Sequence, residues 1–98
     1  MAPEPPLRDT NYAREIATAR LPSGTTGRSF VAIERIYVKQ ARQEEIRFSW
    51  WEDSRMMARP LDLPESELLP LIRAAIAKDV FSSEFLARLQ ELLNEGAA

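Results

Sequence analysis

The side chains of this chain that could carry chemistry are carboxylates, guanidinium and ammonium groups, and aromatic rings, because its 98 residues include neither cysteine nor histidine. Thiolate chemistry and zinc sites of the usual Cys/His kind are therefore excluded. Adjacent acids occur at Glu44 and Glu45 and at Glu52 and Asp53. Paired carboxylates can act as acid and base or hold Mg²⁺ when a cleft brings them together. Both pairs flank predicted turns, so we interpret them as solvated loop charges.

The segment from Gly24 to Ser29 contains glycine, threonine and serine, as a phosphate-binding loop does. That motif requires four residues between its glycines, a lysine before the Ser/Thr, and a preceding strand. The sequence predicts none of the three, so we interpret residues 21–27 as a flexible linker. With no motif for an activated nucleophile elsewhere, we expect no enzymatic activity, no catalytic residue, no cofactor and no bound metal.

Basic and aromatic residues gather in the most strongly β-forming part of the chain. In the stretch 45–51, successive side chains of an extended strand point to opposite faces. Ile46, Phe48 and Trp50 then share one face, which we predict is the core face. The residues predicted to share the other face form the candidate interaction face: Arg35, Tyr37, Lys39, Arg47, Ser49 and Trp51.

A sheet face of this composition can stack single-stranded bases on its aromatic rings while its cations contact phosphates. The alternative is structural: Tyr37 and Trp51 would be covered by a helix or by the N-terminal segment, with arginines at the rim. The two alternatives make opposite predictions about the exposure of Trp51.

Three strands must position these residues, and they are predicted over residues 29–40, 45–51 and 55–61. The apolar residues of the first strand change face near Glu34 and Arg35, which we interpret as a β-bulge rather than as a strand covered on both faces. Pro60 cannot donate to a ladder, so it places the third strand at an edge. The result is a three-stranded antiparallel meander.

A first helix is predicted from the apolar residues that recur at helical spacing between Leu68 and Ile76. We place its N-cap at Ser66. A start at Pro64 would put Pro70 inside the helix, where a lost hydrogen bond costs about 3 kcal/mol.

The last helix is predicted to have Ser82 as its N-cap, with Phe81 packing on Leu86, and to stop at Gly96. Its apolar stripe exceeds what a three-stranded sheet and one companion helix would cover, so we expect a homodimer. The stripe consists of Phe85, Leu86, Leu89, Leu92 and Leu93.

The first 28 residues are predicted to form a flexible N-terminal segment outside the folded domain. The prolines among residues 1–8 indicate a disordered tail, and the spacing of Tyr12, Ile16 and Ala19 is compatible with a short helix over residues 9–20. We therefore expect one α+β domain over residues 29–96.

The charge and hydropathy of the chain limit the kinds of partner that we expect it to bind. The net charge is −2, and residues 60–98 hold seven acids against three bases, which argues against nonspecific nucleic-acid binding but leaves room for a local basic face. No stretch approaches the roughly 18 apolar residues of a membrane helix, and the N-terminus lacks the pattern of a signal peptide. We expect a cytoplasmic protein without a membrane partner.

The predicted order of strands and helices resembles two known families. The strand, helix, helix order from Arg55 to Gly96 resembles the ribbon-helix-helix DNA-binding regulators, but the outward residues Ala58, Pro60 and Asp62 offer no base-reading donors. The meander followed by a helix is similar to single-strand-binding coactivator domains, but residues 56–59 replace the basic, glycine-containing turn expected there. Neither family is assigned.

The sequence therefore predicts an α+β fold, a three-stranded antiparallel meander followed by two C-terminal helices. The predicted function is a small non-enzymatic protein-interaction or self-association module, with a protein or a second copy as its partner. The alternative is a nucleic-acid-binding or regulatory protein that uses the candidate interaction face.

Overall fold

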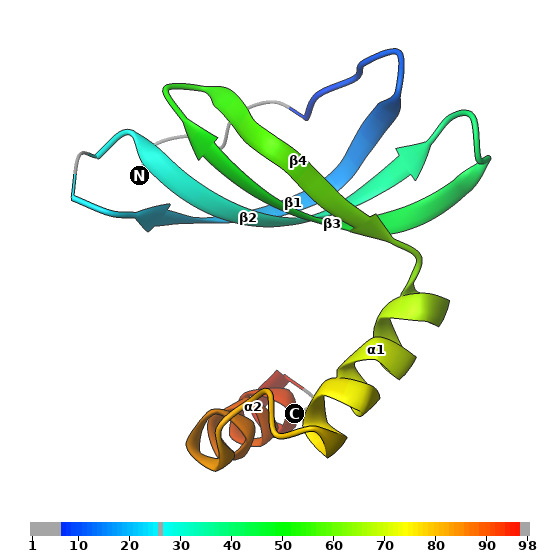
Figure 1. The fold of residues 1–98 in the computed structure, drawn as a ribbon. Coiled ribbons are helices and arrows are strands. Elements are labelled where there is room, and N and C mark those ends of the chain that lie inside the picture. Colours follow the sequence, from blue (N-terminus) through cyan, green and yellow to red (C-terminus); the bar gives the residue numbers. More distant parts are fainter. Residues whose placement is uncertain (1–6, 26, 97–98) are drawn as a thin grey trace. The chain divides into compact units, whose positions relative to one another are not determined.

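A computed structural model describes residues 7–25 and 27–96. Four strands precede two helices, which confirms the predicted α+β class, with one strand more than expected (Figure 1). The chain divides into two compact units between Glu65 and Ser66, where one domain over residues 29–96 was predicted. The elements are β1 Ala13–Ser23, β2 Ser29–Val38, β3 Gln43–Glu52, β4 Arg55–Leu63, α1 Glu65–Ala77 and α2 Ser83–Gly96.

The four strands form one antiparallel sheet in the order β1-β2-β3-β4. Asp53 and Ser54 join β3 to β4 with φ angles of 50° and 68°, as in the two-residue turns that match the twist of a hairpin. The predicted edge position of Pro60 is confirmed, because β4 is an edge strand. Both edge strands, β1 and β4, bend toward the same side of the sheet (Figure 1).

The predicted helix over residues 9–20 is wrong, because residues 13–23 form β1. This strand pairs with β2 along its whole length, from Ala13 opposite Val38 to Ser23 opposite Ser29, and so satisfies the backbone groups of β2 that would otherwise lie at an edge. The folded part thus begins well before residue 29 and includes part of the predicted linker. Most of the predicted disordered tail, residues 1–6, lies outside the described residues.

The bulge predicted near Glu34 and Arg35 is also misplaced. The ladder between β2 and β3 is uninterrupted, whereas the register between β1 and β2 shifts between Glu15 and Ala17. Ile16 is therefore the extra residue of a bulge in β1. Because β2 runs straight through, it carries apolar side chains on both of its faces.

The first helix of the second unit starts at Glu65 rather than after an N-cap at Ser66, so Pro70 lies inside it. The helix tolerates this proline, which is exposed and removes one donor. At the other end Val80 N–H donates to Ala75 O at 3.0 Å and Asp79 N–H to Ile76 O at 3.2 Å. These two bonds form a Schellman motif.

The N-cap of α2 is confirmed: Ser82 Oγ accepts a hydrogen bond from Phe85 N–H at 3.0 Å. The ring of Phe81 lies 5.2 Å from that of Phe85, a contact one residue earlier than the predicted one with Leu86. Neither α1 nor α2 contains a buried residue, and no described helix is long and apolar enough to cross a membrane.

Candidate functional site

The two faces of the sheet have opposite characters, and the face predicted to be the core is the open one. Trp50, predicted to be core, is 47% exposed. Trp51, whose exposure the two alternatives left open, is 3% exposed, as the structural alternative expects. We call the face that contains Trp51 the buried face. Its buried residues are Ala13, Glu15, Ala32, Glu34, Ile36, Val38, Arg47, Ser49 and Trp51.

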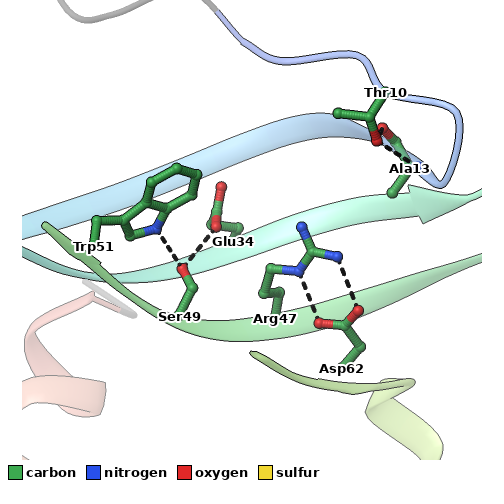
Figure 2. Close-up of polar contacts among 7 residues, drawn as sticks. All are labelled: Thr10, Ala13, Glu34, Arg47, Ser49, Trp51 and Asp62. Carbon is green, nitrogen blue, oxygen red and sulfur yellow. Dashed lines mark hydrogen bonds and ion pairs between the residues drawn. The ribbon is translucent and has the colours of Figure 1, made fainter. Parts of the chain in front are cut away.

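A relay of hydrogen bonds runs across the buried face. Trp51 Nε1–H donates to Ser49 Oγ at 2.8 Å, and Ser49 Oγ–H donates to Glu34 Oε1 at 2.9 Å (Figure 2). The indole N–H, the hydroxyl and one carboxylate oxygen therefore satisfy one another. This explains how polar side chains can occupy the centre of a core face without a large desolvation penalty.

Arg47 and Asp62 form a bidentate ion pair on the same face. Arg47 Nε–H and Nη2–H donate to the two carboxylate oxygens at 2.8 and 2.9 Å (Figure 2), and both side chains are nearly buried. The hydrogen bond to Asp62 raises the pKa of Arg47 above its ordinary value, so the guanidinium stays charged. Because Arg47 belongs to β3 and Asp62 to β4, the pair ties these strands together.

Glu34 is the most deeply buried charged residue, at 1% exposure. Burial raises its pKa, and the neighbouring Glu15 carboxyl raises it further, while the Ser49 hydrogen bond opposes both. Glu34 Oε2 has no donor of its own. A proton on Glu34 Oε2 would enable this oxygen to donate a hydrogen bond to the Glu15 carboxyl and would remove one of two like charges.

The N-terminal segment covers part of the buried face. Arg8 N–H donates to Glu15 Oε1 at 2.8 Å, Glu15 N–H donates to Arg8 O at 2.8 Å, and the Arg8 guanidinium lies 4.4 Å from the centre of the Trp51 ring. The Phe30 ring stacks on Trp51 at 5.5 Å, and Arg20 lies over both rings. Trp51 is thus enclosed by two arginines and one aromatic ring.

A pocket of about 490 Å³ opens between this segment and β4. Arginines and acids both line it, and Asp62 is already neutralised by Arg47. The polar residues in its lining are Arg8, Thr10, Tyr12, Glu15, Arg47, Arg59 and Asp62.

The structure does not bring the six residues of the candidate interaction face together. Arg47, Ser49 and Trp51 lie on the buried face, whereas Arg35 and Tyr37 lie on the other face, because Arg35 pairs with Ile46 in the ladder. Arg35 donates to Glu44 at 3.1 Å and to Glu65 at 2.7 Å.

Lys39, the sixth residue, follows β2 and donates to Asp9 at 2.5 Å and to Thr10 O at 2.6 Å. The sequence placed the two groups beside each other because it predicted a bulge in β2 that is absent.

The second face of the sheet is apolar and open. Leu21, Val31 and Trp50 lie in one row across β1, β2 and β3, and Ile33, Phe48 and Leu61 lie in the next row across β2, β3 and β4. These six residues, which we call the apolar face, are between 36 and 70% exposed. A pocket of about 790 Å³ runs along the rows and is lined by five of the six, all but Leu61. The rest of its lining consists of Ala19, Arg20, Ala32, Ser49, Met57, Arg59 and Pro60.

The described residues include no group of three acids that could hold a metal ion. No protein-family model, curated protein or solved structure matches the chain. The site must therefore be interpreted from its own geometry: a hydrogen-bonded polar network on one face and exposed apolar side chains on the other.

Sequence reasoning missed Glu34 and Asp62, the partners of the relay and of the ion pair. Their signal was present, since Ala32, Glu34 and Ile36 alternate in phase with Val38. This alternation identifies Glu34 as a partner of Ser49 only once the register between β2 and β3 is known.

Proposed function

We propose that this chain is a non-enzymatic protein-interaction or self-association module that works in the cytoplasm and binds through its apolar face. One observation carries the proposal: six large apolar side chains from all four strands remain exposed on one side of the sheet. Contiguous apolar patches of this kind mark interaction sites on soluble proteins.

The contrast between the faces supports this assignment. On the buried face the polar groups of Arg47, Ser49 and Trp51 are bound to partners within the chain. On the apolar face Val31, Ile33 and Trp50 leave about half of their surface exposed, so covering them would release a hydrophobic free energy of about 25 cal/mol per Å². Binding at this face needs no rearrangement of the sheet.

Site-specific photo-crosslinking tests the proposal. A photoreactive phenylalanine analogue at Ile33, which is 54% exposed on the apolar face, should give protein crosslinks in cells. The same analogue at Leu7, which is 53% exposed and outside that face, is the matched control. Equal crosslinking from the two positions would refute the assignment.

A second candidate function is nucleic-acid binding at the buried face, and two observations favour it. Arg8 and Arg20 stack on the Trp51 and Phe30 rings, and Arg59 joins Arg8 at the neighbouring pocket. Aromatic rings flanked by cations suit single-stranded nucleic acids. Here a base would have to displace Arg8 before it could stack on Trp51.

Titration of a fluorescent single-stranded oligonucleotide at 50 and 200 mM salt tests this candidate. Phosphate contacts predict a steep loss of affinity between the two salt concentrations, and Arg59→Ala should weaken binding at the lower one. Absence of binding at low salt would remove the candidate.

A further inference from the structure

We infer that the occupant of the apolar face is a second copy of this chain, placed by a two-fold axis so that Trp50 of each copy enters the pocket of the other. The inference rests on the proposed function, since it names the partner of the same face. Three features of that face carry it: its area, its shape and its distribution of charge.

The area is sufficient for a dimer. A buried aromatic side chain covers about 150–250 Å². The exposed fractions of the six side chains, 36 to 70%, then amount to roughly 600 Å² per copy, with the aliphatic ones taken as somewhat smaller. Two copies would bury about 1,200 Å², which reaches the lower limit of specific, stable interfaces. A single exposed face of this size is at the upper end of what monomers carry.

The shape is self-complementary. Trp50 is 47% exposed and lies between Val31 and Met57 in the ladder, where all three line the pocket of about 790 Å³. A two-fold interface requires the same patch to supply both the projecting group and the recess. An indole beside an apolar recess meets this requirement.

The charges do not oppose self-association. The nearest cation along β2, Arg35, is neutralised by Glu44 and Glu65. A surface that recognised a charged foreign partner would be expected to carry a complementary charge pattern. Arg20 and Arg59 line the pocket, and their repulsion across the axis would limit affinity.

Sedimentation equilibrium of the full chain from 1 to 200 μM tests the inference. The wild type should reach twice the mass of one chain. Leu61→Glu, at a residue 50% exposed on the apolar face, should raise the dimer dissociation constant at least about tenfold, because the interface contains the residue twice. Leu7→Glu, at a residue 53% exposed outside it, should leave the constant unchanged.

Far-UV circular dichroism of each variant checks that it is folded. Leu21→Glu, at the edge of the face and 70% exposed, replaces Leu61→Glu if the latter unfolds. A single-mass monomer at 200 μM, or equal dissociation constants for Leu61→Glu and Leu7→Glu, would overturn the inference.

The two proposals fail in different ways. If the purified chain is a monomer but Ile33 still crosslinks to other proteins and Leu7 does not, the second copy is wrong and the interaction face stands. If neither position crosslinks preferentially and the chain is a monomer, both are wrong.

In the Trp51→Phe variant, whose remaining tryptophan is Trp50, a blue shift of emission on raising the concentration would place Trp50 at the dimer interface.

Discussion

Trp50 and Trp51 are adjacent in the sequence and lie in opposite environments. Trp51 donates its N–H to Ser49 and is enclosed by Phe30 and Arg8, whereas Trp50 is half exposed on the apolar face. The same residue type therefore serves as a core element at one position and as a contact residue at the next. Alternation along a strand makes this possible.

The two tryptophans should respond differently to truncation. Trp51→Ala should lower the free energy of unfolding by about 3–5 kcal/mol, because it empties a buried site and leaves Ser49 without its donor. Trp50→Ala should change it by about 1 kcal/mol or less, measured on the monomer. Urea denaturation at low micromolar concentration measures both. Equal losses would contradict the assignment of the faces.

Glu34 should make stability depend on pH. Its pKa in the folded chain is raised above the ordinary 4.5, chiefly by burial, so the folded state holds the proton more tightly than the unfolded chain. The contribution of Glu34 to the free energy of unfolding should therefore be fully present below pH 4.5 and be lost as the pH rises through the folded pKa.

Glu34→Gln keeps the acceptor for Ser49 and removes the titration. Its stability curve should lack the decline above pH 4.5 that Glu34 causes in the wild type. Urea midpoints at several values between pH 4 and 8 give the comparison. Parallel curves for the two proteins would show that Glu34 ionises freely.

At the scale of elements, β4 is an edge strand with an irregular backbone. Phe48 and Trp50 pair with Leu61 and Met57, so three residues of β4 lie opposite the single residue Ser49. The edge strand therefore bulges over residues 58–60. Bulges and prolines discourage edge strands from pairing further. The Arg47 and Asp62 pair then holds β4 on β3 beyond the bulge.

Breaking that pair should be costly. Asp62→Ala should destabilise the chain by about 3–5 kcal/mol, because it leaves a buried guanidinium without its carboxylate. The double variant Arg47→Met with Asp62→Leu should lose less than Asp62→Ala alone, since it removes both charges. Chemical denaturation of the three proteins tests this. A double variant that is destabilised as much as Asp62→Ala, or more, would argue against a buried pair.

The Schellman motif after α1 offers a stabilising substitution. Asp79 has a φ of 57°, a conformation that glycine and asparagine adopt more readily, and its negative charge lies at the unfavourable end of the helix dipole. Asp79→Asn should stabilise the helical unit by about 0.3–1 kcal/mol. Thermal denaturation followed at 222 nm measures it, with Asp79→Val, which should destabilise the unit, as the control.

At the scale of the whole molecule, both compact units expose apolar surface. The sheet exposes its apolar face, and the helical unit exposes Leu69, Leu71, Leu92 and Leu93. A 98-residue chain has little core to spare, so this surface is a cost for an isolated copy. Association that covers it would add stability.

The amount of hydrophobic dye bound per chain should depend on how much of this apolar surface is exposed. Emission of anilinonaphthalene sulfonate per chain should fall several-fold as the wild type is concentrated from 1 to 200 μM, because dimer formation excludes the dye from the apolar face. Leu61→Glu should show no such dependence and should therefore bind more dye per chain than the wild type at 200 μM, and Leu7→Glu should behave as the wild type. Constant emission per wild-type chain would contradict coverage of that face.

The sequence by itself determined the elements with the strongest local signals. The existence of β2 and β3, the edge position of Pro60 and the N-cap at Ser82 were all predicted correctly, because they depend on residues close in the chain. Even so, β1 was missed, since its short side chains have little periodicity and it is held by pairing with β2.

Only the tertiary structure decided which face of the sheet is the core. The sequence favours burial of Ile46, Phe48 and Trp50, because they are apolar and alternate. The fold instead buries the Trp51 side, since Glu34 and Asp62 from the neighbouring strands and Arg8 from the N-terminal segment saturate its polar groups. Such partners lie 15 to 43 positions away along the chain, and only the register of the strands and the curl of the sheet bring them together.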